Sequence, residues 1–212
     1  MRSCLCLVGL ALALYVSALN AGQVPARRTR TIPFSGKPVA ESLLPDDDIV
    51  EIAPFGEALG RYDEPPRVLF ERGVQRAAMI VEVDVTVVSG VLADEGMFVR
   101  TRFVGQVREV IAARNVKPGD GISVGQPLEF SVGGGEVAIR GVVVRTVLRA
   151  DYPFPAQYVV VLDHKAQENG WSVGLSPPLL IAGDKASPVA PAKSIIGGLS
   201  LREMREIAKA AK

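Results

Sequence analysis

A two-residue alternation between Ala77 and Val87 constrains the fold of this chain more than any other feature of its sequence. The odd positions of the segment are all apolar: Ala77, Met79, Val81, Val83, Val85 and Val87. Positions 82, 84 and 86, which lie between them, carry Glu, Asp and Thr. Because successive side chains of a β-strand point to opposite faces of the sheet, the pattern predicts a strand with one buried face.

The partner of this strand is predicted in Met97–Ile111, where apolar and polar residues again alternate. The link between the two segments contains two glycines and two acids, which is typical of a hairpin. A register that places Val83 opposite Phe103 also places Asp84 opposite Arg102, so it satisfies both faces of the sheet. We therefore predict an antiparallel hairpin in which Phe103 and the valines at 81, 83 and 85 are buried.

Further short strands are predicted downstream, separated by turns rich in Gly and Pro. They cover residues 122–124, 128–132, 136–148, 158–162, 170–173 and 179–182. The glycines 133–135 form one of the turns, and Val142–Val144 predicts a strand covered on both faces because every position is apolar. The sequence thus indicates a mainly β domain over residues 66–182. It is either a small antiparallel barrel, with an OB-like barrel as one possibility, or a sandwich.

The first 18 residues are interpreted as a secretory signal peptide. Arg2 precedes an uncharged apolar run, Cys4–Ala18, that falls short of the roughly 20 residues of a membrane-spanning helix. Cleavage is expected after Ala18 or, alternatively, after Ala21. Both cysteines of the chain leave with this segment, and a mature domain without disulfides fits a bacterial envelope. We expect a secreted or periplasmic protein that keeps no stable membrane span after cleavage.

Proline-rich segments flank the predicted domain. Prolines recur through residues 19–65, which predicts an extended arm because proline breaks helices and removes a ladder donor from strands. Within this arm, Ile49–Phe55 is expected to lie against the domain. A short helical turn is expected at Val68–Arg72, ending at Gly73. Residues 183–198 are rich in Pro and Ala and are interpreted as a linker.

Residues 199–212 are predicted to form an amphipathic helix. Ser200 and Glu203 have the spacing of a capping box, in which each side chain binds the backbone amide of the other residue. Leu201, Met204 and Ile207 form an apolar stripe that requires cover, because so short a helix is marginal on its own. We interpret these three as partner-binding residues, with docking on the chain's own domain as the alternative.

No catalytic, cofactor-binding or metal-binding residue is predicted. His164 is the only histidine and is expected in a surface turn, and no cysteine remains for a metal site after signal cleavage. The glycine run lacks the Lys-Ser/Thr of a phosphate loop. Asp46–Asp48 lacks the ligand spacing of a calcium loop, so a solvated run is expected there.

The charge balance argues against nucleic acid as a partner. Without Arg2 the 24 basic residues become 23, against 23 acidic ones, so no bulk charge attracts a polyanion. Arg100, Arg102 and Arg108 share one predicted strand face. Acids on the neighbouring strand, such as Asp84, are expected to pair with them.

Strand and turn motifs occur at Thr101–Phe103, Val107–Val110, Pro118–Asp120, Gly134–Glu136 and Gln157–Leu162. In this combination they resemble a pattern seen in uncharacterised bacterial secreted β-proteins, over residues 76–182. The resemblance implies a barrel-like β-domain and export. It implies no activity.

Two functions remain open from the sequence. The leading hypothesis is an exported, non-enzymatic β-domain that binds a protein or cell-wall partner, because no catalytic constellation is found and the helix at 199–212 needs cover. The alternative is a secreted hydrolase that uses a pair of carboxylates, which 23 acidic residues permit. Two buried acids facing each other in a cleft would favour the enzyme. Acids confined to rims and strand exteriors would favour the binding domain.

Overall fold

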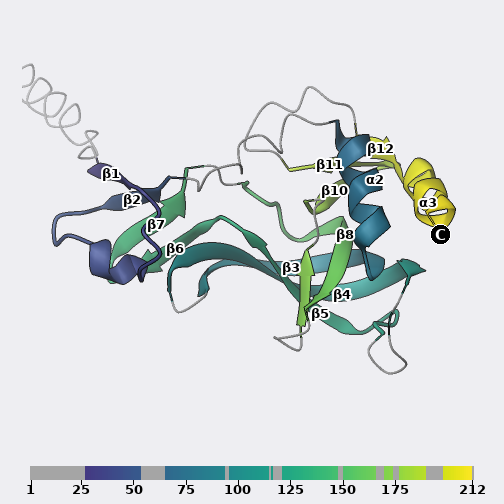
Figure 1. Cartoon of the computed structure of the whole chain (residues 1–212), viewed down its shortest axis with the longest axis horizontal. Coiled ribbons are helices and arrows are strands. Elements are labelled where there is room, and N and C mark those ends of the chain that lie inside the picture. The colour runs from purple at the N-terminus through teal and green to yellow at the C-terminus, as the bar shows by residue number, and fades with distance from the viewer. Residues whose placement is uncertain are drawn as a thin grey trace, which may run out of the picture.

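The computed structural model describes residues 27–53, 65–93, 96–114, 116, 121–147, 150–165, 170–173, 177–189 and 198–211. The architecture is mainly β and sandwich-like, with two sheets and a short C-terminal helix (Figure 1). This confirms the predicted fold class, and of the two predicted architectures the sandwich-like one is found. The small sheet lies at one end of the molecule, and two helices cover the large sheet toward the other end.

The small sheet has the strand order β1-β2-β7-β6, and the large sheet has the order β12-β11-β10-β8-β3-β4-β5-β9. The small sheet consists of β1 (Thr29–Ile32), β2 (Ile49–Ile52), β6 (Glu136–Ile139) and β7 (Val142–Thr146). The large sheet consists of β3 (Met79–Ala93), β4 (Phe98–Ala113), β5 (Pro127–Gly133), β8 (Ala156–Lys165), β9 (Gly170–Val173), β10 (Leu179–Ala182), β11 (Lys185–Pro188) and β12 (Leu199–Ser200). The helices are η1 (Val39–Ser42, a 3-10 helix), α2 (Pro66–Arg76) and α3 (Leu201–Ala210). The large sheet curls, so that β9 pairs with both β5 and β8.

The hairpin of β3 and β4 is confirmed, but its predicted register is wrong. Val83 lies opposite Val107 rather than Phe103, and Asp84 lies opposite residue 106 rather than 102. The strands run further toward the turn than expected, and three irregularities shift the pairing along the ladder. The buried face itself is as predicted, because Phe103 and the valines at 81, 83 and 85 are at most 1% exposed.

A bulge at Thr86 explains the exception in the alternating strand. Val85 pairs with Gly105 and Val87 pairs with Val104, so Thr86 has no opposite residue on β4. The extra residue reverses the alternation of side chains between the two faces. As a result Val87 is 47% exposed, although it continues the odd-numbered apolar series.

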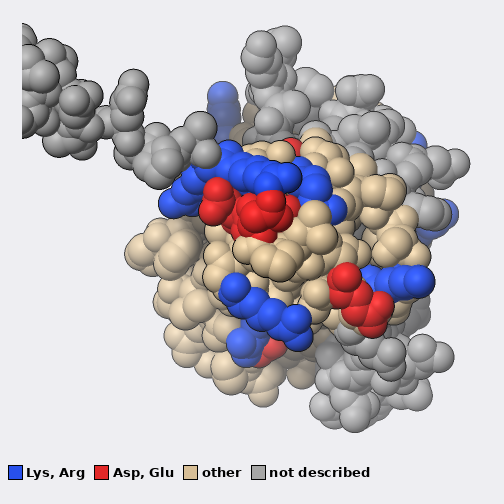
Figure 2. Space-filling model, turned by 90° about the vertical axis from the view of Figure 1, so that its left-hand side faces the viewer, with Lys and Arg blue, Asp and Glu red and all other residues tan. Residues whose placement is uncertain are grey.

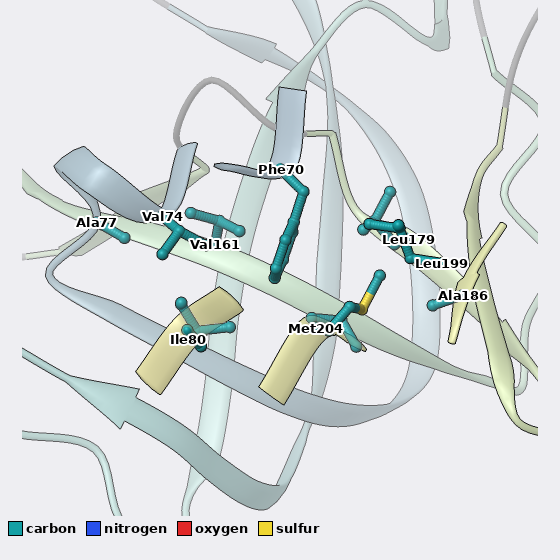
Figure 3. Close-up of a cluster of buried hydrophobic side chains, with 11 residues drawn as sticks. Phe70, Val74, Ala77, Ile80, Val161, Leu179, Ala186, Leu199 and Met204 are labelled. Atoms are coloured by element: carbon teal, nitrogen blue, oxygen red, sulfur yellow. The ribbon is translucent and has the colours of Figure 1, made fainter. Parts of the chain in front are cut away.

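Two hydrophobic clusters lie on the two faces of β3 and β8. One is enclosed by the curled sheet and includes Phe103, Phe130 and Tyr158. The other lies under the helices and includes Phe70, Val74, Ile80, Val161, Leu179 and Met204 (Figure 3). Because β8 contributes to both clusters, residues 158–162 are all buried, as the continuous apolar run predicts.

Glycines form the junction between the two sheets. The run Gly133–Gly135 leads from β5 in the large sheet to β6 in the small sheet. Thr101 of β4 donates a hydrogen bond from its hydroxyl to the carbonyl oxygen of Gly134, at 2.9 Å. On β3, a β-carbon at Gly90 would overlap the carbonyl oxygen of Glu136. At Gly90 the two sheets therefore approach through backbone, and elsewhere Val99 of β4 packs with Val50 and Val144 of the small sheet.

Part of the predicted N-terminal arm belongs to the small sheet. β1 and β2 are four-residue strands, and β2 pairs with β7 over Ile49–Ile52. Asp47 was expected in a solvated run, but it is 6% exposed and accepts hydrogen bonds from Arg30 at 2.9 and 2.6 Å. These bonds, followed by one from the Leu44 amide, hold the pKa of Asp47 down to about 2. The burial was missed because the partner is 17 residues away on β1.

Two predicted strands are corrected by local turns. Residues 136–148 do not form one strand, because Arg140 and Gly141 adopt φ angles of 51° and 85° and turn the chain between β6 and β7. Residues 122–124 are not a strand either. The Gln126 amide donates to the carbonyl oxygen of Ser123, and Gly125 between them has a φ of 83°. In β7, Val143 is half-buried, so this strand is not fully covered on both faces.

Two segment boundaries also differ from the prediction. α2 does not end at Gly73 but continues to Arg76, because burial of Phe70 and Val74 outweighs the weak helix preference of glycine. Residues 185–188, which were assigned to the linker, form β11. This strand pairs with β10 and buries Ala186 completely.

Two other expectations concern the signal peptide and membrane-spanning segments. The signal peptide predicted at residues 1–18 lies outside the described residues. Within the part of the chain that the structure describes, no helix is long and apolar enough to cross a membrane.

Candidate functional site

The C-terminal helix begins at the predicted residue. The amide of Glu203 donates to the hydroxyl oxygen of Ser200 at 3.2 Å, and the amide of Ser200 donates to Glu203 Oε2 at 2.9 Å. Both halves of the capping box are therefore present. The hydrogen bonds from the Ser200 hydroxyl and amide lower the pKa of the Glu203 carboxyl.

The apolar stripe of α3 packs on the chain's own domain. Met204 is fully buried in the cluster under the helices, and Leu201 and Ile207 are half-buried against the same cluster. Met204 is therefore not available to a partner in this arrangement. Of the three residues predicted for partner binding, Ile207 also lines an open groove.

This groove lies between α2 and α3 and has a volume of about 530 Å³. Its polar lining consists of Arg67, Glu71 and Gln75 of α2 and of Glu203 and Glu206 of α3. Ile207 and two alanines, Ala210 and Ala211, supply its apolar part. The groove thus combines a small apolar floor with a charged rim.

The two helices run side by side in the same direction. Arg67 and Glu203 interact electrostatically near the beginnings of the helices. Near their ends, Arg114 donates to the carbonyl oxygen of Val74 at 2.8 Å and also to that of Ala208. Each helix carries partial negative charge at its C-terminal end, so one guanidinium stabilises both ends.

A pair of glutamates lies beneath α3. Glu82 of β3 and Glu109 of β4 are directly opposite each other in the hairpin. Arg205 of α3 donates from Nη2 to Glu82 at 2.8 Å and to Glu109 at 2.6 Å. The Glu82 side chain is 7% exposed, whereas those of Arg205 and Glu109 are 36% and 42% exposed. Arg205 therefore bridges the two carboxylates and fastens α3 to the hairpin.

This arrangement is poorly suited to acid–base catalysis. Burial, and then the charge of Glu109, raise the pKa of Glu82, while Arg205 lowers it. A raised pKa is a property of general acids, but the group must also reach a substrate. Here one guanidinium nitrogen binds both carboxylates, and the Glu82 carboxyl is also hydrogen-bonded to Glu109. The single positive charge of Arg205 offsets one of the two negative charges of the carboxylate pair.

Replacing Arg205 with methionine should lower the free energy of unfolding by about 1–3 kcal/mol at neutral pH, because it leaves the Glu82 carboxylate buried beside Glu109. Arg108 contributes a weaker attraction to Glu82 and does not replace the bridge. A carboxyl whose pKa is raised in the folded state loses stabilisation as the pH rises through that pKa. The difference between wild type and variant should therefore shrink as the pH falls and Glu82 becomes protonated.

Urea unfolding at several pH values between 4 and 8 measures this difference. Arg102→Met is the matched control, since Arg102 pairs with Glu129 at an exposed position of the same hairpin. An exposed ion pair contributes little to stability, so the free energy of unfolding of the control should be close to that of the wild type at every pH. An Arg205→Met variant as stable as the control would show that Arg205 does not hold the buried carboxylate.

Arg100, Arg102 and Arg108 all have partners, but of the three only Arg108 lies near the predicted acid, Asp84. Arg102 binds Glu129 of β5 at 2.7 Å rather than Asp84, and Arg100 lies over the ring of Phe98 at 5.2 Å. Arg108 does lie near Asp84, at 3.9 Å. These arginines therefore form no continuous unpaired basic stripe.

The surface of the small sheet mixes both signs of charge. Figure 2 shows Lys and Arg side chains beside Asp and Glu side chains on this end of the molecule. Arg28 pairs with Asp46, and Arg145 of β7 donates to Glu51 of β2 at 2.6 Å. Interleaved pairs of this kind create no extended field of one sign.

His164 does not lie in a turn. It belongs to β8, which extends to Lys165, and it is opposite Trp171 of β9 in the ladder. The strand continues because β9 returns alongside it, a long-range pairing that the local sequence does not indicate. Among the described residues, no group of three or more His, Cys, Asp or Glu residues is arranged to hold a metal ion.

Sequence reasoning missed the residues that attach α3. Arg205 is 123 positions from Glu82, and Arg114 is 94 positions from Ala208, so neither contact has a signal in spacing. Glu82 gave no distinctive signal either, because in the sequence it belongs to the polar series of β3 with Asp84 and Thr86. A scan against protein-family models finds no match to this chain, and a search of curated proteins finds none either.

Proposed function

We propose that this chain is an exported, non-enzymatic β-domain that binds a protein or cell-envelope partner. The observation that carries the proposal is the bridge from Arg205 to Glu82 and Glu109. This bridge holds both carboxylates in a structural contact. A hydrolase would need to keep the same two groups free for its substrate. The open groove beside α3 provides a surface on which a partner can dock.

A hydrolase based on this carboxylate pair is the weaker alternative. Hydrolysis of a glycosidic bond requires two carboxyl groups flanking the bond, with space between them for the substrate and, in inverting enzymes, a water. Glu82 and Glu109 face each other as such a pair would, which is the feature in favour of the alternative. The guanidinium that binds both of them is the feature against it.

Export is supported by the apolar N-terminal run and by the resemblance to secreted β-proteins. If the proposal is right, protein purified from its native host should begin near Leu19 or Gly22. Intact-mass spectrometry of the native protein measures this directly. An intact Met1 on most molecules, or recovery from the cytoplasmic fraction, would contradict export.

Partner binding is tested by crosslinking in the intact envelope, followed by affinity purification of the chain. The expected result is one reproducible crosslinked protein or cell-wall fragment. Deleting α3 is not a clean control, because Met204 is part of the core. Substitutions at the exposed rim of the groove keep the fold and are the better comparison. Absence of any specific crosslink, together with hydrolytic activity lost in Glu82→Gln, would favour the hydrolase.

A further inference from the structure

The groove between α2 and α3 has an excess of negative charge. Three of its lining residues, Glu71, Glu203 and Glu206, are acids, and only Arg67 is basic. Arg67 already donates to Glu71 at 2.8 Å and interacts with Glu203, so its charge is satisfied within the groove. The lining residues alone carry two net negative charges, with Lys185 near Glu203 and Arg202 paired with Glu206 beside the groove. At neutral pH the groove therefore favours cations over anions.

The direction of the helices brings their two C-terminal ends to one end of the groove, where Arg114 already binds one carbonyl oxygen of each helix. Gln75 lies in the last turn of α2, and Ala210 and Ala211 lie at the end of α3, so both C-terminal ends meet at one end of the groove. The carbonyl groups of a helix C-terminus carry partial negative charge and interact favourably with Lys and Arg. The same end is lined by small alanine side chains, which allow another backbone to approach closely.

The apolar part of the groove favours a polypeptide over a simple cation as the ligand. Ile207 is half-buried and lies between the charged rims of the two helices. Polypeptide segments commonly dock in such grooves by laying a few apolar side chains on the floor while their charged side chains meet the rim. The ion pair between Arg202 and Glu206 does not prevent this, because the Arg202 side chain is 88% exposed and such pairs contribute little.

We infer that the α2–α3 groove binds a basic segment of a protein partner, with Lys or Arg side chains on Glu71 and Glu206 and an apolar residue on Ile207. This rests on the proposed binding function and specifies its site and the chemistry of its partner. Charge complementarity selects this occupant. A polyanion or an anionic lipid surface would face the two excess negative charges and be repelled.

A defined peptide tests the site. The probe is a fluorescein-labelled 16-residue amphipathic peptide of Leu, Ala and Lys, and its counterpart carries Glu in place of every Lys. Fluorescence anisotropy with the full chain at low salt should show saturable binding of the Lys peptide and at least about tenfold weaker binding of the Glu peptide. Raising the salt concentration should weaken the Lys complex.

Two variants locate the binding. Glu71→Gln/Glu206→Gln removes two charges from the rim and should weaken the Lys complex by about tenfold. Asp46→Asn/Glu129→Gln removes the same charge from exposed positions outside the groove and should leave the affinity within about twofold of wild type. Equal weakening in the two variants, equal affinity for the two peptides, or no binding of the Lys peptide would overturn the inference.

The same variants separate this inference from the broader proposal. If the crosslinked partner persists in Glu71→Gln/Glu206→Gln, the chain is a binding domain but the groove is not its site. If the wild type crosslinks nothing, the proposed function itself fails. Sedimentation of the wild type as a dimer that the groove variant abolishes would identify a second copy as the occupant and would also overturn the inference.

Discussion

Replacing Phe103 with alanine should lower the free energy of unfolding by about 3–5 kcal/mol, the usual cost of emptying an aromatic core site. Phe103 is fully buried at the centre of the cluster inside the curled sheet. Its ring stacks on Phe130 at 4.7 Å and meets Tyr152 and Tyr158 edge-on, at 4.8 and 6.0 Å. Alanine removes all three ring contacts and leaves a cavity lined by the remaining rings.

Urea unfolding followed by the fluorescence of Trp171, which packs against this cluster, measures the loss. Val87→Ala provides the control on the same hairpin. Because Val87 is 47% exposed behind the Thr86 bulge, its truncation should change the free energy by less than about 0.5 kcal/mol. A loss below roughly 1 kcal/mol for Phe103→Ala would show that its ring is not part of a packed core. A large loss for Val87→Ala would contradict the bulge.

Replacing Gly90 with alanine should destabilise the protein by about 3 kcal/mol, at the upper end of the usual cost of overpacking. The added β-carbon would overlap the carbonyl oxygen of Glu136 and lie 3.2 Å from the amide nitrogen of Val137. Both contacts are to backbone atoms of β6, which cannot move aside as a flexible side chain can. The junction between the sheets must therefore open.

Gly133→Ala is the matched control for this prediction. Gly133 also lies in a strand, but no atom lies within 4 Å of a β-carbon built there. The free energy of unfolding of Gly133→Ala should therefore lie within about 0.5 kcal/mol of the wild-type value. The urea midpoint of each variant gives the comparison. Equal midpoints for Gly90→Ala and Gly133→Ala would mean that the two sheets do not meet at Gly90.

Features that depend on local geometry could be predicted from the amino-acid sequence alone. The alternation of β3 identified a buried face because a strand repeats every two residues, and the valines at 81, 83 and 85 do lie in the core. The start of α3 was predicted at the correct residue because Ser200 and Glu203 bind each other across a single turn. Neither prediction required knowledge of any distant part of the chain.

The register of the β3–β4 hairpin could not be predicted from the sequence, because it is set by a competition between strands. Shifting Val83 from Phe103 to Val107 keeps an apolar pair on the inner face, so the apolar pattern alone does not choose between the two registers. The bulge at Thr86 and the neighbours β5 and β8 decide it. The same limitation led to the wrong partner for Arg102, which is Glu129 on β5.

How the elements are joined, and where a candidate site lies, depends on contacts between distant parts of the folded chain. Position 90 requires glycine because the backbone of β6 lies against it. The Glu82 carboxylate is tolerated in a buried strand because Arg205 of α3, 123 residues later in the chain, binds it. The groove between α2 and α3 exists because Arg114 and a shared core hold two helices side by side. The sequence records which side chains are apolar, charged or small. It does not record which distant backbone brings them together, because those contacts depend on the packing of the whole chain.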